Sequence, residues 1–147
     1  MDAAGGKILV LSKRDNPPLL YALPLSPKKD HVLAKKIASV QQIPPPTTED
    51  HRQKHGLYRS QPTALDISPD GCRAVVLTYK HAYLFKRPSR GSWVAAFSEQ
   101  PLTIPLPLPE NFPDLRQREA ICFTPDGNSL IVTSEGRGAG IYVLNPR

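Results

Sequence analysis

The chain has 147 residues, 39% of them hydrophobic, and a formal net charge of +6, which is enough material for one domain with a modest core. It contains no apolar run long enough to cross a membrane and no secretory signal, so we expect a cytoplasmic protein. Its seventeen prolines would obstruct long helices. The basic residues are scattered over turns and links, which argues against a nucleic-acid interface.

The first part of the chain, residues 7–43, reads as an incomplete β unit. Ile8–Ser12 and Leu20–Leu23 are rich in residues that favour strands. Val32–Ile43 would supply a further strand, although a helix over Asp30–Val40 competes with it.

A Pro-rich link over residues 44–62 leads to the most complete unit, residues 63–108. Its strand-like runs alternate with turn signals, as expected for antiparallel strands. The predicted strands are Ala64–Ile67, Ala74–Tyr79, Ala82–Phe85 and Trp93–Phe97. We interpret Trp93 as a packing residue.

A second Pro-rich link, residues 101–113, precedes a third unit over residues 118–145. This unit repeats the first three strands of the second one and contains no fourth. The predicted strands are Ala120–Phe123, Leu130–Glu135 and Ile141–Leu144.

The turn Ser68–Gly71 recurs as Thr124–Gly127, each time between two predicted strands. Proline favours the second position of a type I turn, aspartate the third, and glycine the left-handed conformation that often follows. We therefore interpret both aspartates as turn formers. The residues with this structural role are Pro69, Asp70, Gly71, Pro125, Asp126 and Gly127.

A tyrosine also recurs, as Tyr21, Tyr83 and Tyr142, at the same place in the third strand of each unit. Recurrence at equivalent positions favours packing between sheets over ligand binding. Cys72 and Cys122 occupy non-equivalent positions, so we expect no disulfide. Repetition at about fifty residues is typical of stacked β units such as propeller blades.

These motifs carry a resemblance to a known family. Ala64–Gly71, Arg118–Gly127 and Thr133–Glu135 resemble bacterial WD40-like six-bladed β-propellers, a group that includes esterase-like phytases. The resemblance covers residues 7–147. It implies an all-β, propeller-like fold of about three four-stranded antiparallel blades, the first and last incomplete. It also implies that the chain corresponds to the C-terminal half of such a propeller.

About three blades cannot close a ring alone, and open ends would expose blade faces and strand edges. We therefore expect a homo-oligomer, a two-fold dimer in which two copies complete six blades. The alternative partner is another chain that supplies the complementary half.

Ligands of propellers usually sit where the innermost strands meet the central channel. Five polar residues map to strand ends there: Arg118, Glu119, Glu135, Thr63 and Tyr79. Two carboxylates and an arginine could bind a ligand or act as acid and base. They could equally form a surface ion pair or a structural network that lines the channel. We predict no metal site and no cofactor.

Two classes of function follow from this reading. We prefer a non-catalytic binding or assembly module that completes a ring by self-association. The alternative is an esterase or phosphoesterase with its site at the channel mouth around Glu119 and Glu135.

Overall fold

The computed structural model describes residues 1–88, 91–106 and 117–146. Within these residues it contains ten strands, arranged in three antiparallel sheets, and only short helical segments. The prediction of an all-β, propeller-like fold of a few blades is confirmed. No helix in the described part of the chain is long and apolar enough to span a membrane.

Sheet 1 consists of β1 (Lys7–Leu11), β2 (Leu19–Pro24) and β3 (Lys35–Ser39), in that order. The third strand is shorter than the predicted Val32–Ile43, and the competing helix does not form. The two lysines that open β3 are exposed on the edge of the sheet. Charged edge strands resist unwanted pairing with other chains.

Sheet 2 is the central sheet, with the order β4 (Pro62–Ile67), β5 (Arg73–Thr78), β6 (His81–Lys86) and β7 (Leu102–Pro105). Residues of both its faces are buried, so β5 and β6 read as continuous apolar runs. Its fourth strand, β7, lies inside the segment that the sequence marked as a Pro-rich link. Proline is tolerated there because β7 is an edge strand.

Sheet 3 has the order β10 (Ile141–Leu144), β9 (Leu130–Ser134) and β8 (Arg118–Phe123). Buried and half-buried residues alternate along β9, and exposed and half-buried residues alternate along β10. This alternation shows that one face of sheet 3 packs against the protein and the other does not.

The prediction of a strand over Trp93–Phe97 was wrong, because these residues form helix α2 (Trp93–Ser98). The hydroxyl of Ser92 accepts a bond of 3.1 Å from the amide of Ala95, which caps the helix. Trp93, Ala96 and Phe97 are buried, and their spacing has the period of a helix. The run was too short for periodicity to separate helix from strand.

Trp93 is a packing residue, as predicted, and it also anchors the start of the chain. Its indole N–H donates to the Asp2 carboxylate at 2.8 Å, and the Arg87 guanidinium lies 3.5 Å from the same oxygen. Asp2 is buried, so these donors compensate the cost of removing its charge from water.

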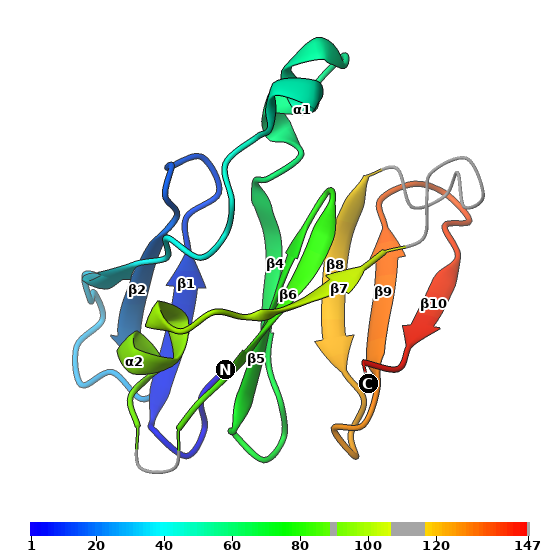
Figure 1. The fold of residues 1–147 in the computed structure, drawn as a ribbon. Coiled ribbons are helices and arrows are strands. Elements are labelled where there is room, and N and C mark those ends of the chain that lie inside the picture. The colour runs from blue at the N-terminus through cyan, green and yellow to red at the C-terminus, as the bar shows by residue number, and fades with distance from the viewer. Residues whose placement is uncertain (89–90, 107–116, 147) are drawn as a thin grey trace.

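Two further short segments, α1 (Thr48–Arg52) and η1 (Gly56–Tyr58), lie within the link that precedes β4. They project beyond one end of sheet 2, as Figure 1 shows. We call this end of the fold the α1 end, and the opposite end, where both Pro-Asp-Gly turns lie, the turn end.

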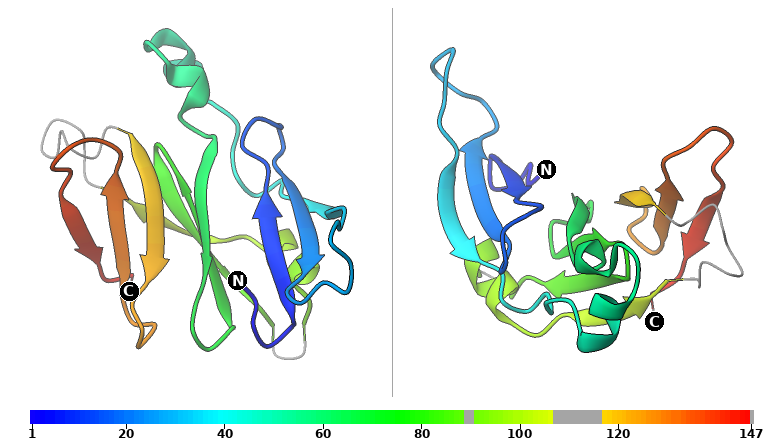
Figure 2. Two further views of the ribbon diagram at one scale, coloured as in Figure 1. Left: turned by 180° about the vertical axis from the view of Figure 1, so that it is seen from behind. Right: turned by 90° about the horizontal axis from the view of Figure 1, so that it is seen from above.

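The three sheets fan out around a common axis, with β4 and β8 towards it and β3, β7 and β10 towards the outside (Figure 2). One apolar core lies between sheets 1 and 2, and α2 packs on it; a second core lies between sheets 2 and 3. Sheet 2 is therefore covered on both faces, while sheets 1 and 3 are each covered on one.

The repeated turns have the predicted geometry. Gly71 donates to the Ser68 carbonyl at 2.8 Å, Gly127 donates to that of Thr124 at 2.8 Å, and both glycines have positive φ. The Asp70 carboxylate accepts from the backbone of Cys72 at 2.9 Å, so the aspartate acts inside its own turn.

We expect Gly71→Ala to destabilise the fold by about 1–2 kcal/mol, because a left-handed residue with a Cβ is strained. Gly71 has φ of +67°, and an added Cβ would lie 3.2 Å from the Arg87 guanidinium. Gly71→Asn should recover part of the loss, since asparagine tolerates this conformation. Urea unfolding of both variants measures the difference; equal stability of Gly71→Ala and the parent would contradict it.

Candidate functional site

Polar side chains from all three sheets meet at the α1 end. Lys13 follows β1, Tyr79 follows β5, and Glu119 is the second residue of β8. The Tyr79 hydroxyl donates to Glu119 Oε1, and Lys13 Nζ donates to the Tyr79 hydroxyl at 3.0 Å. Lys13 Nζ also lies 3.4 Å from Glu119 Oε2. We call these residues the inter-sheet triad, because each comes from a different sheet.

Contacts within the triad shift the pKa values of Lys13 and Tyr79. The hydrogen bond with Tyr79, helped by the negative charge of Glu119, raises the pKa of Lys13 above 10.5. Burial, together with the bond to Glu119, raises the pKa of Tyr79 above 10.0. At neutral pH Lys13 is therefore a cation and Tyr79 a neutral phenol, and each is hydrogen-bonded within the triad.

The other predicted site residues lie at the same end but make different contacts. The Arg118 side chain is buried and donates to the backbone carbonyl of Tyr79, which ties β8 to sheet 2. The Thr63 hydroxyl donates to the carbonyl of Leu77 at 3.4 Å, within its own sheet. Glu135 is exposed, and its carboxylate makes no hydrogen bond or ion pair with any described residue.

A second polar cluster surrounds Asp50 of α1, whose side chain is only 2% exposed. Its carboxylate accepts from Lys80 Nζ at 2.8 Å and from the hydroxyl of Thr47 at 2.8 Å. The guanidinium of Arg59 lies 3.7 Å away. These contacts fix α1 on the turn between β5 and β6.

Burial alone would raise the pKa of Asp50, but the hydrogen bonds from Lys80 and Thr47 outweigh burial and lower it to about 2. Nearby, burial and the positive charge of Lys80 lower the pKa of His81 from 6.5. The aspartate is thus charged and the imidazole neutral at physiological pH.

This arrangement holds the α1 end together more clearly than it suggests catalysis. In the described part of the chain, no serine, threonine or cysteine side chain is hydrogen-bonded to a histidine imidazole, the contact that would activate a nucleophile; Thr78 bonds only the backbone of His81. The Glu119 carboxylate already accepts hydrogen bonds from Lys13 and Tyr79. No group of three potential metal ligands is found among the described residues.

Sequence reasoning missed Lys13 and Asp50. Lys13 lies in a loop whose path cannot be read from residue patterns. Asp50 did leave a signal, because Thr47-x-x-Asp50 has the spacing of a capping box, in which each residue bonds the other's backbone.

We expect Tyr79→Phe to lower the free energy of unfolding by about 1 kcal/mol, the usual contribution of a side-chain hydrogen bond. The change removes the hydroxyl that bridges Lys13 and Glu119. Tyr58→Phe is the matched control, because the Tyr58 side chain is exposed and its hydroxyl has no bond within the described residues. Equal stability of the two variants would show that the triad does not join the sheets.

Comparison with protein-family models and with curated proteins finds no match to this chain. The likeness to WD40-like propellers, ligand binding at the channel mouth and the hydrolase alternative therefore stay predictions.

Proposed function

We propose that the protein is an assembly module whose two outer sheets join those of a second copy to complete a six-sheet ring. The proposal rests on one observation. A cross-strand valine–tyrosine pair recurs in all three sheets. A neighbouring sheet covers this pair in sheets 2 and 3 but not in sheet 1. The pairs are Val10 with Tyr21, Val76 with Tyr83, and Val132 with Tyr142.

In sheets 2 and 3 this pair faces the preceding sheet. Val76 and Tyr83 belong to the core between sheets 1 and 2, and Val132 and Tyr142 belong to the core between sheets 2 and 3. Val76 is fully buried, whereas its counterpart Val10 is 44% exposed. The outer face of sheet 1 thus has the residues of a buried inter-sheet surface without the sheet that covers it.

The outer face of sheet 3 is the opposite half of such a surface. On this face Val143 pairs with Ile131, and Ile141 pairs with Thr133. Ile141 and Val143 are 72% and 61% exposed. Their counterparts in sheet 2, Ala82 and Leu84, are buried against sheet 3.

A second copy fits these faces better than another occupant does. The two exposed faces lie at opposite ends of the fan (Figure 2), so two copies related by a two-fold axis would pair sheet 1 of each with sheet 3 of the other. Each new contact would then repeat the contacts between neighbouring sheets inside the chain.

Charge also favours pairing of unlike sheets. Lys36, exposed in β3, lies opposite Tyr21, so contact between two copies of sheet 1 would bring like charges together. The two cross-strand pairs on the outer face of sheet 3 are uncharged. Glu135, which follows β9, has no partner among the described residues. Sheet 1 against sheet 3 avoids this repulsion.

The two free cysteines provide a test without any mutation. Cys122 lies opposite Ile131 on the outer face of sheet 3, whereas Cys72 directly follows the Ser68–Gly71 turn of sheet 2; both are exposed. On dilution, the reaction of Cys122 with a thiol reagent should accelerate as the dimer dissociates. Cys72 should react at a constant rate. Equal rates for Cys122 at all protein concentrations would refute the proposal.

A further inference from the structure

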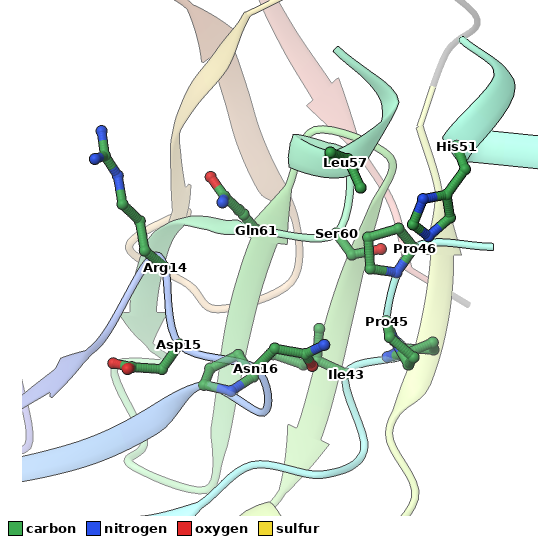
Figure 3. Close-up of a pocket in the computed structure, with 12 residues that line it drawn as sticks. Arg14, Asp15, Asn16, Ile43, Pro45, Pro46, His51, Leu57, Ser60 and Gln61 are labelled. Atoms are coloured by element: carbon green, nitrogen blue, oxygen red, sulfur yellow. The ribbon is translucent and has the colours of Figure 1, made fainter. Parts of the chain in front are cut away.

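A cavity of about 290 Å³ lies at the α1 end, between the loop that joins β1 to β2 and the segment around α1 and η1 (Figure 3). Its volume is close to the lower bound of ligand pockets, about 300 Å³, so it suits a ligand of a single ring. The lining residues belong to one chain, so this site does not depend on ring closure. Its polar members are Arg14, Asp15, Asn16, His51, Ser60 and Gln61.

The side chains of Arg14, Asp15, Asn16 and His51 are exposed, and those of Ser60 and Gln61 are half-buried. None of them makes a hydrogen bond or ion pair with any described residue. A few residues away, the side chains of Lys13, Asp50 and Arg59 are all paired. Figure 3 shows the Arg14 and Asp15 side chains directed away from the prolines, so Asn16, Ser60 and Gln61 are the polar groups best placed to bind a ligand in the cavity.

The rest of the wall is apolar. Ile43 is almost fully buried at the cavity, and prolines 44 to 46 and Leu57 add further carbon surface. No phenylalanine, tyrosine or tryptophan is among the lining residues. Nucleobases are usually held by stacking on such aromatic rings, so the wall is poorly suited to a base.

The hydrogen-bonding capacity of the polar groups further limits the chemical class of the ligand. The Asn16 and Gln61 amides can each donate and accept, and so can the Ser60 hydroxyl. A ligand that satisfies all three needs groups that act as donor and acceptor in many directions. Hydroxyl groups on a saturated ring meet this need, and the ring's C–H surface can lie on the prolines.

We propose that this cavity binds one neutral sugar ring, either a free monosaccharide or the terminal sugar of a glycan. The hydroxyl groups contact Asn16, Ser60 and Gln61, and one face of the ring packs on the prolines. Figure 3 places the loop residues Arg14 to Asn16 on one side of the site and His51 on the other. The two sides together would enclose the ring.

Titration of the ¹⁵N-labelled protein, followed by two-dimensional NMR, tests the proposal. The probes are D-glucose, D-galactose, N-acetyl-D-glucosamine and their methyl glycosides, with adenosine as the competing chemistry. We expect at least one sugar to shift the resonances of the lining residues in a saturable way. Shifts with methyl glycosides point to a glycan, and shifts with free sugars alone point to a monosaccharide. No saturable shift with any sugar, or shifts with adenosine alone, would overturn the proposal.

Variants connect the binding to the cavity. Gln61→Ala should weaken the affinity by about 2–10-fold, which corresponds to one lost hydrogen bond. Gln100→Ala is the control, because Gln100 is exposed and lies outside the cavity. Ser60→Leu should fill the site and abolish the shifts while the remaining spectrum stays that of the folded chain. Unchanged affinity in both cavity variants would place the sugar elsewhere and contradict the assignment.

Discussion

Val143→Lys is expected to leave the chain monomeric, with a dimer dissociation constant raised by about 100-fold or more. Val143 is on the outer face of sheet 3, where the proposed contact would bury it. Placing an unpaired charge in an apolar interface costs several kcal/mol, and about 3 kcal/mol corresponds to 100-fold in affinity. Sedimentation velocity measures the change. Val94→Lys, on an exposed position of α2, should dimerise like the parent.

Mixing two variants separates the proposed arrangement from its alternatives. Val10→Lys should also be monomeric, because each contact in the two-fold ring uses sheet 1 of one copy and sheet 3 of the other. A mixture of Val10→Lys and Val143→Lys contains one intact pair of faces, so it should form a heterodimer. If either variant alone dimerises like the parent, the contact joins like sheets and the ring does not form.

The second large effect is expected at Asp50. We expect Asp50→Ala to lower the free energy of unfolding by about 2–3 kcal/mol. The change leaves Lys80 and Arg59 without their partner and removes one of the two hydrogen bonds of the capping box of α1, the one that Asp50 accepts from the Thr47 backbone. Loss of one partner of a fully buried pair costs about 3–5 kcal/mol, and both cations here can turn partly to water. Glu49→Ala, which breaks an exposed pair with Arg52, should cost less than about 0.5 kcal/mol.

Asp50 also makes stability depend on pH in acid. Its pKa is about 2 in the folded protein against 3.8 ordinarily, so its contribution is present above pH 3.8 and is lost as the pH falls towards 2. The shift corresponds to about 2 kcal/mol, since one pKa unit is about 1.4 kcal/mol. Urea unfolding across this range measures it. Asp50→Asn should flatten this part of the profile; an unchanged profile would assign the acid sensitivity to other carboxylates.

The fold class could be predicted from the sequence because its signals are local and repeated. Proline, aspartate and glycine specify the turn wherever they occur together, and the β-branched runs on either side specify the strands. The recurring tyrosine gave the register between units, and Tyr83 is buried between sheets as the repeat implied.

The errors arose where local signals conflict or where long-range packing decides. Trp93–Ser98 contains residues that favour strands, yet Ser92 caps it as a helix whose apolar side packs on the core between sheets 1 and 2. The fourth strand of sheet 2 was not predicted, because the prolines around it indicated a link. Lys13 reaches Glu119 across 106 positions of the chain, a contact that no residue spacing could indicate.

The central claim is that two copies close a ring through unlike outer sheets, and the molar mass in solution tests it most directly. Sedimentation equilibrium should give twice the chain mass of 16.2 kDa at micromolar concentration, with reversible dissociation on dilution. A mass of 16.2 kDa at every concentration up to the solubility limit would contradict it.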